Sequence, residues 1–184
     1  DSFWQEVADY ILPSREFNRM NTPGQKRMSR IYNTLPILAC EQLAGGLHGM
    51  LTSPQLRWFA LRCTDPRLAG NEEAERWFAA VTDRMYEHFN SPKAGFATAA
   101  HELYMDVSGF GTGTMYVQDR GVAGPIFRSV PLAECYIAEG EDGRIDTLFR
   151  RYKWSLRNIV TTWPDHGNAE LAKRAEATPD AMEE

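Results

Sequence analysis

The sequence predicts an α+β fold in which N-terminal helices are followed by antiparallel β-hairpins and short C-terminal helices. In the first 110 residues, apolar side chains recur at steps of three and four, which is typical of amphipathic helices. After Gly111 the pattern changes to alternating apolar and polar residues, which is typical of strands. These strands are not separated by helices, as a βαβ nucleotide-binding sheet requires, so we expect antiparallel pairing.

Four helices are expected in the N-terminal region, and their limits follow from the apolar periodicity and from stop signals. They lie near Phe3–Leu12, Leu35–Met50, Asn71–Asn90 and Lys93–Ser108. Pro13 ends the first helix, and the run Asn21-Thr22-Pro23-Gly24 is a loop signal after it. Thr34 is a suitable N-cap for the second helix, which tolerates Pro36 in its first turn.

The second and third helices carry unusual features. Gly45, Gly46 and Gly49 each cost about 1 kcal/mol inside a helix, so another backbone approaches closely there or the helix ends early. In the third helix, Asn71 is a suitable N-cap, and one apolar stripe consists of Trp77, Phe78, Val81, Met85 and Phe89. A stripe of this kind is typical of core packing, so these five side chains are predicted to be buried together. We therefore expect Trp77→Ala to cost about 3–5 kcal/mol.

Strands are expected in the next region, followed by two short helices. The strands are Thr112–Gln118, Ile126–Val130, Glu134–Glu139 and Arg144–Trp154, and the helices are Leu156–Thr162 and Ala169–Ala177. Asp142-Gly143 between two strand-like runs is a strong hairpin signal. The chain thus divides into a mainly helical region (1–110), an antiparallel β region (111–154) and a region of short helices (155–184).

Composition excludes several classes of protein. The 184 residues include 43% hydrophobic and 24% charged residues, with a net charge of −5, as in ordinary globular domains. Apolar runs are far shorter than the roughly 20 residues of a membrane span, and no secretory signal is visible. The three cysteines Cys40, Cys63 and Cys135 form no CxxC pair, so a zinc ribbon and a redox motif are excluded. They are expected to be reduced thiols.

Two basic clusters interrupt the acidic average. They are Arg15, Arg19, Lys26, Arg27 and Arg30, and then Arg144, Arg150, Arg151, Lys153 and Arg157. Either cluster can contact phosphates, but a solvated face or salt bridges within an assembly is favoured because no nucleic-acid motif accompanies them. A nucleic-acid-binding module that uses the basic hairpin 144–154, with Tyr152 and Trp154 stacking on bases, stays open as an alternative.

The sequence contains no convincing catalytic or metal-binding motif. His101-Glu102 opens like the HExxH motif of zinc proteases, but Met105 stands where the second histidine is required. The glycines between Gly109 and Gly113 follow a helix and precede a strand, the reverse of the order in a dinucleotide-binding loop. His48, His88 and His166 stand alone. We therefore predict no enzyme, no catalytic residue, no metal and no cofactor, with a small hydrolase around His101, Glu102 and Asp106 as a further alternative.

An ordered set of segments resembles a known family. The segments are Trp4, Tyr10-Ile11-Leu12-Pro13, residues 43–54, Trp58-Phe59, residues 101–106, residues 110–113, Val130-Pro131 and Tyr136-Ile137. Together they are similar to the N-terminal half of the head-to-tail connector, or portal, proteins of T7-like short-tailed bacteriophages. The family-motif positions are Leu51, Thr52, Ser53, Pro54, Trp58, Phe59, His101, Glu102, Tyr104, Phe110, Gly111, Thr112, Pro131 and Tyr136.

The resemblance implies a structural protein rather than an enzyme. Portal subunits form a ring, typically a dodecamer, at one capsid vertex, through which double-stranded DNA is packaged and ejected without sequence specificity. The implied partners are further copies of the chain, the terminase packaging motor, scaffold and major capsid proteins, and tail adaptor proteins, with no membrane involved. The implied location is the virion, after assembly in the host cytoplasm. Residues 1–110 would belong to the wing, and the stem and clip would lie beyond Glu184.

A closed ring needs an interface whose two sides differ. The two basic clusters, opposed to the acidic stretch Glu72–Glu87, are one hypothesis for these sides. Leu51-Thr52-Ser53-Pro54 and the following Trp58-Phe59 provide another, because large aromatic residues often anchor subunit contacts. For this segment we favour a helix stop followed by two aromatic residues that pack on the core.

Overall fold

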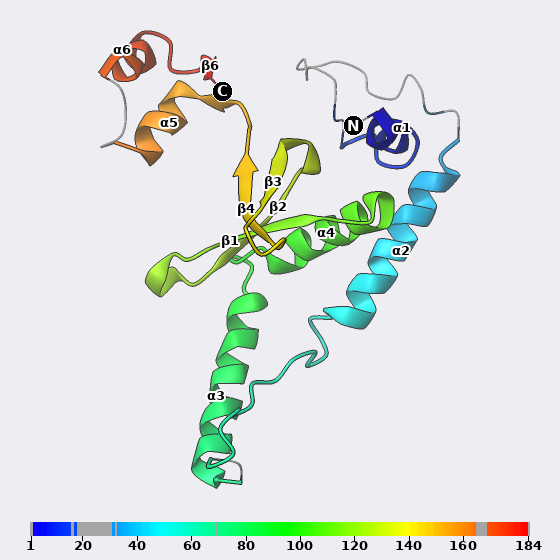
Figure 1. Cartoon of the computed structure of the whole chain (residues 1–184), viewed down its shortest axis with the longest axis vertical. Helices are drawn as coiled ribbons and strands as arrows, with labels where there is room; N and C mark the ends of the chain where they lie inside the picture. Colours follow the sequence, from blue (N-terminus) through cyan, green and yellow to red (C-terminus); the bar gives the residue numbers. More distant parts are fainter. Residues whose placement is uncertain are drawn as a thin grey trace. The chain divides into compact units, whose positions relative to one another are not determined.

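The computed structural model describes residues 2–15, 17, 31, 33–68, 70–164 and 169–183. The chain forms two compact units, which are unit 1 (Asp1–Ala133) and unit 2 (Glu134–Glu184). Figure 1 shows the predicted order, with helices first, then antiparallel hairpins and short C-terminal helices. The α+β prediction is confirmed. The division at residues 110 and 154 stays a prediction.

Unit 1 contains four helices. They are α1 (Ser2–Tyr10), α2 (Leu35–Leu51), α3 (Glu72–Phe89) and α4 (Phe96–Phe110). The last of them begins three residues later than predicted, because residues 92–94 form a turn and Gly95 adopts a positive φ of 69°, which glycine reaches without strain. Helix α2 continues through its three glycines to Leu51, so an early end of this helix is excluded.

The helix caps agree with the prediction in α3 but not in α2. Asn71 accepts hydrogen bonds from the backbone N–H groups of Glu73 and Ala74, as expected. Thr34 is the N-cap residue of α2, yet its side chain makes no cap bond. The Asn33 side chain accepts from the Leu35 N–H at 2.9 Å instead. An amide oxygen one residue earlier thus replaces the predicted threonine hydroxyl.

A hairpin follows α4 in unit 1. Strands β1 (Thr114–Gln118) and β2 (Ile126–Val130) pair antiparallel, with Val117 opposite Phe127, and η1 (Gly121–Ala123) lies between them. Gly111 ends α4 with a φ of 77°, and its N–H donates to the Val107 carbonyl. The glycine-containing segment 109–113 is therefore a helix-to-strand turn, as predicted.

Helix α4 is the centre of unit 1. Helices α1 and α2 and strands β1 and β2 all contact it. Its buried side chains are Ala99, Ala100 and Asp106, and small alanines allow the neighbouring elements to come close. At the start of α4, Phe96 packs against Phe89 and the buried Phe127, with ring centroids about 5 Å apart.

The predicted core stripe of α3 is wrong at Trp77, whose surface is 60% exposed. The other four members are half-buried, and Thr82 is the buried residue of this helix. The helix packs on an extended segment: Phe59 N–H donates to the Tyr86 hydroxyl at 2.7 Å, and Leu61 N–H donates to Thr82 Oγ1 at 3.1 Å. This segment is too narrow to cover the whole stripe, so Trp77 stays in solvent.

Unit 2 contains a second hairpin and two short helices. Strands β3 (Cys135–Glu139) and β4 (Ile145–Arg150) pair antiparallel, and η2 (Leu132–Glu134) precedes them. β5 (Trp154–Ser155) pairs with β6 (Met182–Glu183), next to α5 (Leu156–Thr162) and α6 (Ala169–Ala177). The predicted strand Arg144–Trp154 is therefore divided in two. The division follows the bond from Arg151 N–H to the Glu134 carbonyl, which closes the hairpin.

Candidate functional site

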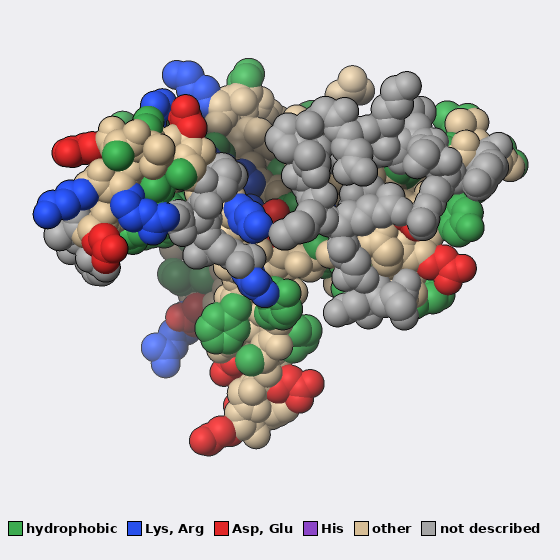
Figure 2. All heavy atoms as spheres, turned by 90° about the horizontal axis from the view of Figure 1, so that it is seen from above, with side chains coloured by type: hydrophobic (Ala, Val, Ile, Leu, Met, Phe, Trp, Pro, Cys, Tyr) green, Lys and Arg blue, Asp and Glu red, His purple; other side chains and the backbone are tan. Residues whose placement is uncertain are grey.

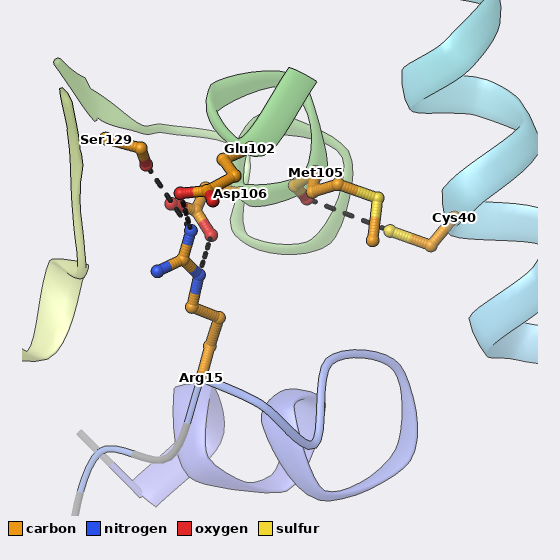
Figure 3. A network of polar contacts seen from close by, with 6 residues as sticks. All are labelled: Arg15, Cys40, Glu102, Met105, Asp106 and Ser129. Carbon is orange, nitrogen blue, oxygen red and sulfur yellow. Dashed lines mark hydrogen bonds and ion pairs between the residues drawn. The ribbon is translucent and has the colours of Figure 1, made fainter. Parts of the chain in front are cut away.

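A network of polar contacts joins three elements of unit 1 around α4 (Figure 3). The Arg15 guanidinium, which follows α1, places Nε 3.0 Å from Asp106 Oδ1 and Nη2 3.3 Å from Glu102 Oε2. Nη2 also donates to Ser129 Oγ on β2 at 3.3 Å. Glu102 and Asp106 lie on one face of α4 because they are four residues apart. Arg15 therefore ties the N-terminal segment to both α4 and β2.

Asp106 is the most deeply buried polar side chain of this network, with 0% of its surface exposed. Burial raises the pKa of its carboxyl from 3.8 to about 6, because water no longer stabilises the charge. The positive charge of Arg15 lowers this pKa by less than burial raises it, and the negative charge of Glu102 raises it further. Asp106 therefore exchanges its proton in mildly acidic solution.

Cys40 of α2 lies close to the same network. Its thiol donates to the Met105 carbonyl of α4 at 3.7 Å. Burial raises the pKa of this thiol, and the charges of Asp106 and Glu41 raise it further. A thiol held protonated in this way is a poor nucleophile. Cys40 thus serves α2–α4 packing, and all three cysteines are free.

A second polar group connects the end of α2 with α4. Thr52 Oγ1 lies 3.0 Å from His48 Nδ1 and 3.2 Å from the Tyr104 hydroxyl. The rings of His48 and His101 are 6.3 Å apart. Burial lowers the pKa of His48, and the neighbouring His101 lowers it further. In the sequence His48 stands alone, whereas in the structure it lies against Thr52 and His101. Through Thr52, the end of α2 is joined to Tyr104 of α4.

Trp58 and Phe59 belong to an aromatic cluster beside the β1–β2 hairpin. Trp58 stacks on Phe96, with ring planes 9° apart and centroids 5.7 Å apart. Phe59 stacks on Tyr86 at 4.5 Å. These contacts agree with the predicted packing on the core, although Trp58 keeps 37% of its surface exposed.

The other family-motif positions of unit 1 lie at element ends. Leu51 is exposed at the end of α2, Ser53 accepts from the Gln55 N–H, and Pro54 is an exposed turn residue. Phe110, at the end of α4, lies 6.1 Å from Trp4 and 5.1 Å from Phe17, measured between ring centroids.

The last four positions are spread over both units. Gly111 and the exposed Thr112 connect α4 to β1, and the half-buried Pro131 follows β2. Tyr136 belongs to unit 2, where it lies opposite Phe149 and is exposed. Four family-motif positions therefore lie on α4 or at its contact with α2, namely Thr52, His101, Glu102 and Tyr104. Tyr136 lies in the other unit.

The contacts do not support a hydrolase. Glu102 is paired with Arg15, Asp106 is closed off from solvent, and His101 lies beside His48 rather than beside a carboxylate. A nucleophile, a base and an orienting acid in mutual reach are therefore not found at these residues. In the described part of the chain, no group of three or more His, Cys, Asp or Glu side chains is arranged to hold a metal ion.

The contacts do not support the nucleic-acid hairpin either. Arg150 pairs with Glu134 at 2.8 Å and lies over the Tyr152 ring at 4.2 Å. The same hairpin carries the acids Glu139, Glu141, Asp142 and Asp146. On the face in Figure 2, Lys and Arg side chains are interspersed with Asp and Glu. Of the other basic cluster, Arg15 is paired within unit 1, and Arg19, Lys26, Arg27 and Arg30 lie outside the described residues.

Sequence reasoning missed the Arg15–Asp106 pair. The two residues are 91 positions apart, and the sequence places Arg15 in a basic cluster expected to form a solvated face or salt bridges within an assembly. The spacing of Glu102 and Asp106 on one helix face was the signal that a cation from elsewhere would meet them. Nothing in the sequence indicated that Ser129 would join them.

Two apolar surfaces remain uncovered by the described residues. On α2, Leu35, Leu38, Leu43 and Met50 are exposed, Met50 at 75%, and a Cβ added at Gly45, Gly46 or Gly49 meets nothing within 4 Å. On the β3–β4 hairpin, the opposed pairs Tyr136–Phe149 and Ile137–Leu148 point to opposite faces and are all exposed. Contiguous exposed apolar surface of this kind is typical of interaction sites.

Among the helices in the described segments, none is both long and apolar enough to span a bilayer.

Comparison with known proteins identifies the family. The family described as bacteriophage head to tail connecting protein matches residues 1–184. The probable portal protein of Bordetella phage BPP-1 is 31% identical over 161 residues, which cover 86% of this chain. The portal protein of Salmonella phage epsilon15 is 27% identical over 164 residues, or 87% of this chain. The chain spans 29% of the length of each relative. Because the family match extends along every residue, the chain belongs to the bacteriophage head to tail connecting proteins.

Proposed function

We propose that the chain is part of a structural portal subunit that assembles with further copies into a ring at a capsid vertex. Double-stranded DNA passes through this ring during packaging and ejection. The family match over residues 1–184 carries the proposal, and the two relatives named as portal proteins support it. The part played by the chain is mechanical, so no catalytic residue and no cofactor are needed.

The uncovered surfaces favour an assembled state over a monomer. A helix that is apolar around its whole circumference is normally buried, and α2 carries one acid, Glu41, and no Lys or Arg. Its core side packs on α4 through Cys40 and Ala44, whereas its opposite side carries leucines and glycines without any cover among the described residues. A neighbouring subunit supplies such a cover in a ring.

The remaining partners follow from the portal role. They are the terminase packaging motor, the scaffold and major capsid proteins, the tail adaptor proteins and DNA, held without sequence specificity. The location is the virion, with assembly in the host cytoplasm. A ring of twelve copies is the expected stoichiometry. We expect this assembly to depend on the residues at the fourteen family-motif positions.

Electron microscopy of the full-length connector that carries this chain tests the proposal. Rings with a central hole are expected, and counting their rotational symmetry gives the number of subunits. A protein that stays monomeric at micromolar concentration, with its fold intact by circular dichroism, contradicts the proposal. Strongly salt-dependent binding of single-stranded oligonucleotides by the monomer would favour a nucleic-acid-binding module instead.

A further inference from the structure

The turn between β1 and β2 holds an apolar side chain out in solvent. Val122 of η1 is fully exposed, more than any other large apolar side chain in the described part of the chain. Two hydrogen bonds hold the turn: the Gly121 N–H donates to Asp119 Oδ1 at 2.8 Å, and the Gly124 N–H donates to the Gly121 carbonyl at 2.9 Å. Gly124 is buried against His88 of α3. A surface that covers this valine therefore gains its burial and loses little ordering entropy.

A groove in unit 1 has the apolar lining that such a side chain needs. It lies between α3 and the preceding segment 57–68, and its volume is about 500 Å³. This volume lies within the range of binding pockets, so the groove has room for a valine and the turn that carries it. Its apolar lining includes Leu61, Leu68, Ala74 and Phe78. Cys63, a free thiol, also lines it.

The charged side chains of the turn and of the groove are complementary. Asp119 and Arg120 precede Val122 in the turn. Arg62 and Glu75 line the groove. None of these four charged groups forms an ion pair with another residue that the structure describes. The acid and the base of the turn can therefore pair with the arginine and the glutamate of a groove.

We propose that the β1–β2 turn of one copy of the chain inserts Val122 into the groove beside α3 of the next copy. The turn and the groove are different places on one unit, and Val122 stays exposed in its own chain. Such a contact is heterologous, so each added copy leaves a free turn at one end and a free groove at the other until a ring closes. The inference rests on the proposed ring and names one contact between its subunits.

Cross-linking in the full-length connector tests this contact, because Cys63 lines the groove. Val122→Cys adds a thiol to the turn, and a short bismaleimide joins nearby thiols without the strict geometry of a disulfide. Dimers and higher multiples are expected on a denaturing gel, above the level of the treated wild type, and Cys63→Ser in the same background is expected to abolish them. Rings of the Val122→Cys variant that give no such products, or products that survive Cys63→Ser, overturn the proposal.

Charge exchange between the turn and the groove gives a second test. Arg120→Glu and Glu75→Arg are each expected to raise the concentration at which half of the connector assembles by about threefold or more, and the two together to restore it. Arg128→Glu, an exposed change on β2 of the same hairpin, is the matched control and is expected to leave this concentration unchanged.

Sedimentation measures assembly, with circular dichroism as the check on folding. A double variant that assembles as poorly as the single ones contradicts the contact while the ring of the wild type still stands. A wild type that forms no ring contradicts the proposed function itself.

Discussion

Helices α3 and α4 of unit 1 differ in how much of their surface is buried, and the difference is the opposite of what their sequences predict. Helix α3 has an Asn71 cap, three acids in its first turn and a bulky apolar stripe, yet Thr82 is its one buried residue among those described. Helix α4 has no side-chain cap and no acid in its first turn, yet four elements contact it. Periodicity shows which side of a helix is covered. The number of neighbours decides how much is buried, and small residues such as Ala99 and Ala100 admit more of them.

The largest expected effect belongs to an aromatic side chain that packs near the start of α4. Phe127 is buried and contacts both Phe89 and Phe96. Phe127→Ala is expected to lower the free energy of unfolding by about 3–5 kcal/mol, because it leaves a cavity beside the rings of Phe89 and Phe96. Urea titration of the chain measures this loss. A loss below about 1 kcal/mol would mean that the region around α4 is no better packed than the surface of α3.

The Arg15 contact to α4 comes next. Arg15→Met leaves Asp106 buried without a cation, so its free energy of unfolding is expected to be about 3 kcal/mol lower than that of the wild type at pH 8. Burial already raises the pKa of Asp106 to about 6, and removal of Arg15 raises it further. At pH 5 the carboxyl is therefore protonated in the folded variant, and the loss is expected to be smaller. Denaturant titrations at both pH values check the sign, and an equal or larger loss at pH 5 contradicts it.

Much of the fold follows from local sequence, whereas the site does not. Pro13, Asn71, Gly111 and Asp142-Gly143 act on their immediate neighbours, so the ends of helices and the hairpin turn could be predicted. The exposure of Trp77 could not be predicted, because it depends on how much of α3 is covered by the extended segment 57–63. The Arg15–Asp106 pair depends on contacts 91 residues apart, which no local pattern encodes.

Truncation of Trp77 is the α3 counterpart of Phe127→Ala. Its ring is 60% exposed, and its aromatic contact in α3 is with Phe78 at 5.0 Å. Trp77→Ala is expected to lower the free energy of unfolding by about 1 kcal/mol or less, since little area returns to water and alanine favours the helix. This expected loss replaces the loss of several kcal/mol that was predicted when Trp77 was assigned to a buried apolar stripe. A measured loss above about 3 kcal/mol in the same titration would place Trp77 in the core.

Alanine substitutions at two helical glycines are expected to change stability in opposite directions. A Cβ at Gly46 of α2 meets nothing within 4 Å, whereas a Cβ at Gly109 of α4 lies 2.6 Å from Leu12 Cδ1. Gly46→Ala is therefore expected to raise the free energy of unfolding by about 0.5–1 kcal/mol, the gain of alanine over glycine in a helix. Gly109→Ala is expected to lower it by about 1 kcal/mol or more, because the buried Leu12 must move.

The Gly46→Ala variant also tests whether the exposed apolar side of α2 is a subunit contact. Glycines let a neighbouring backbone approach closely, so Gly46→Ala should weaken the assembly of the full-length connector while it stabilises the chain. Sedimentation analysis of the variant, compared with the wild type at matched concentrations, measures this. A variant that is more stable and assembles normally would show that no backbone approaches Gly46. In that case the subunit contact has to be sought on the exposed faces of the β3–β4 hairpin, where Ile137→Ser and Phe149→Ser probe one face each.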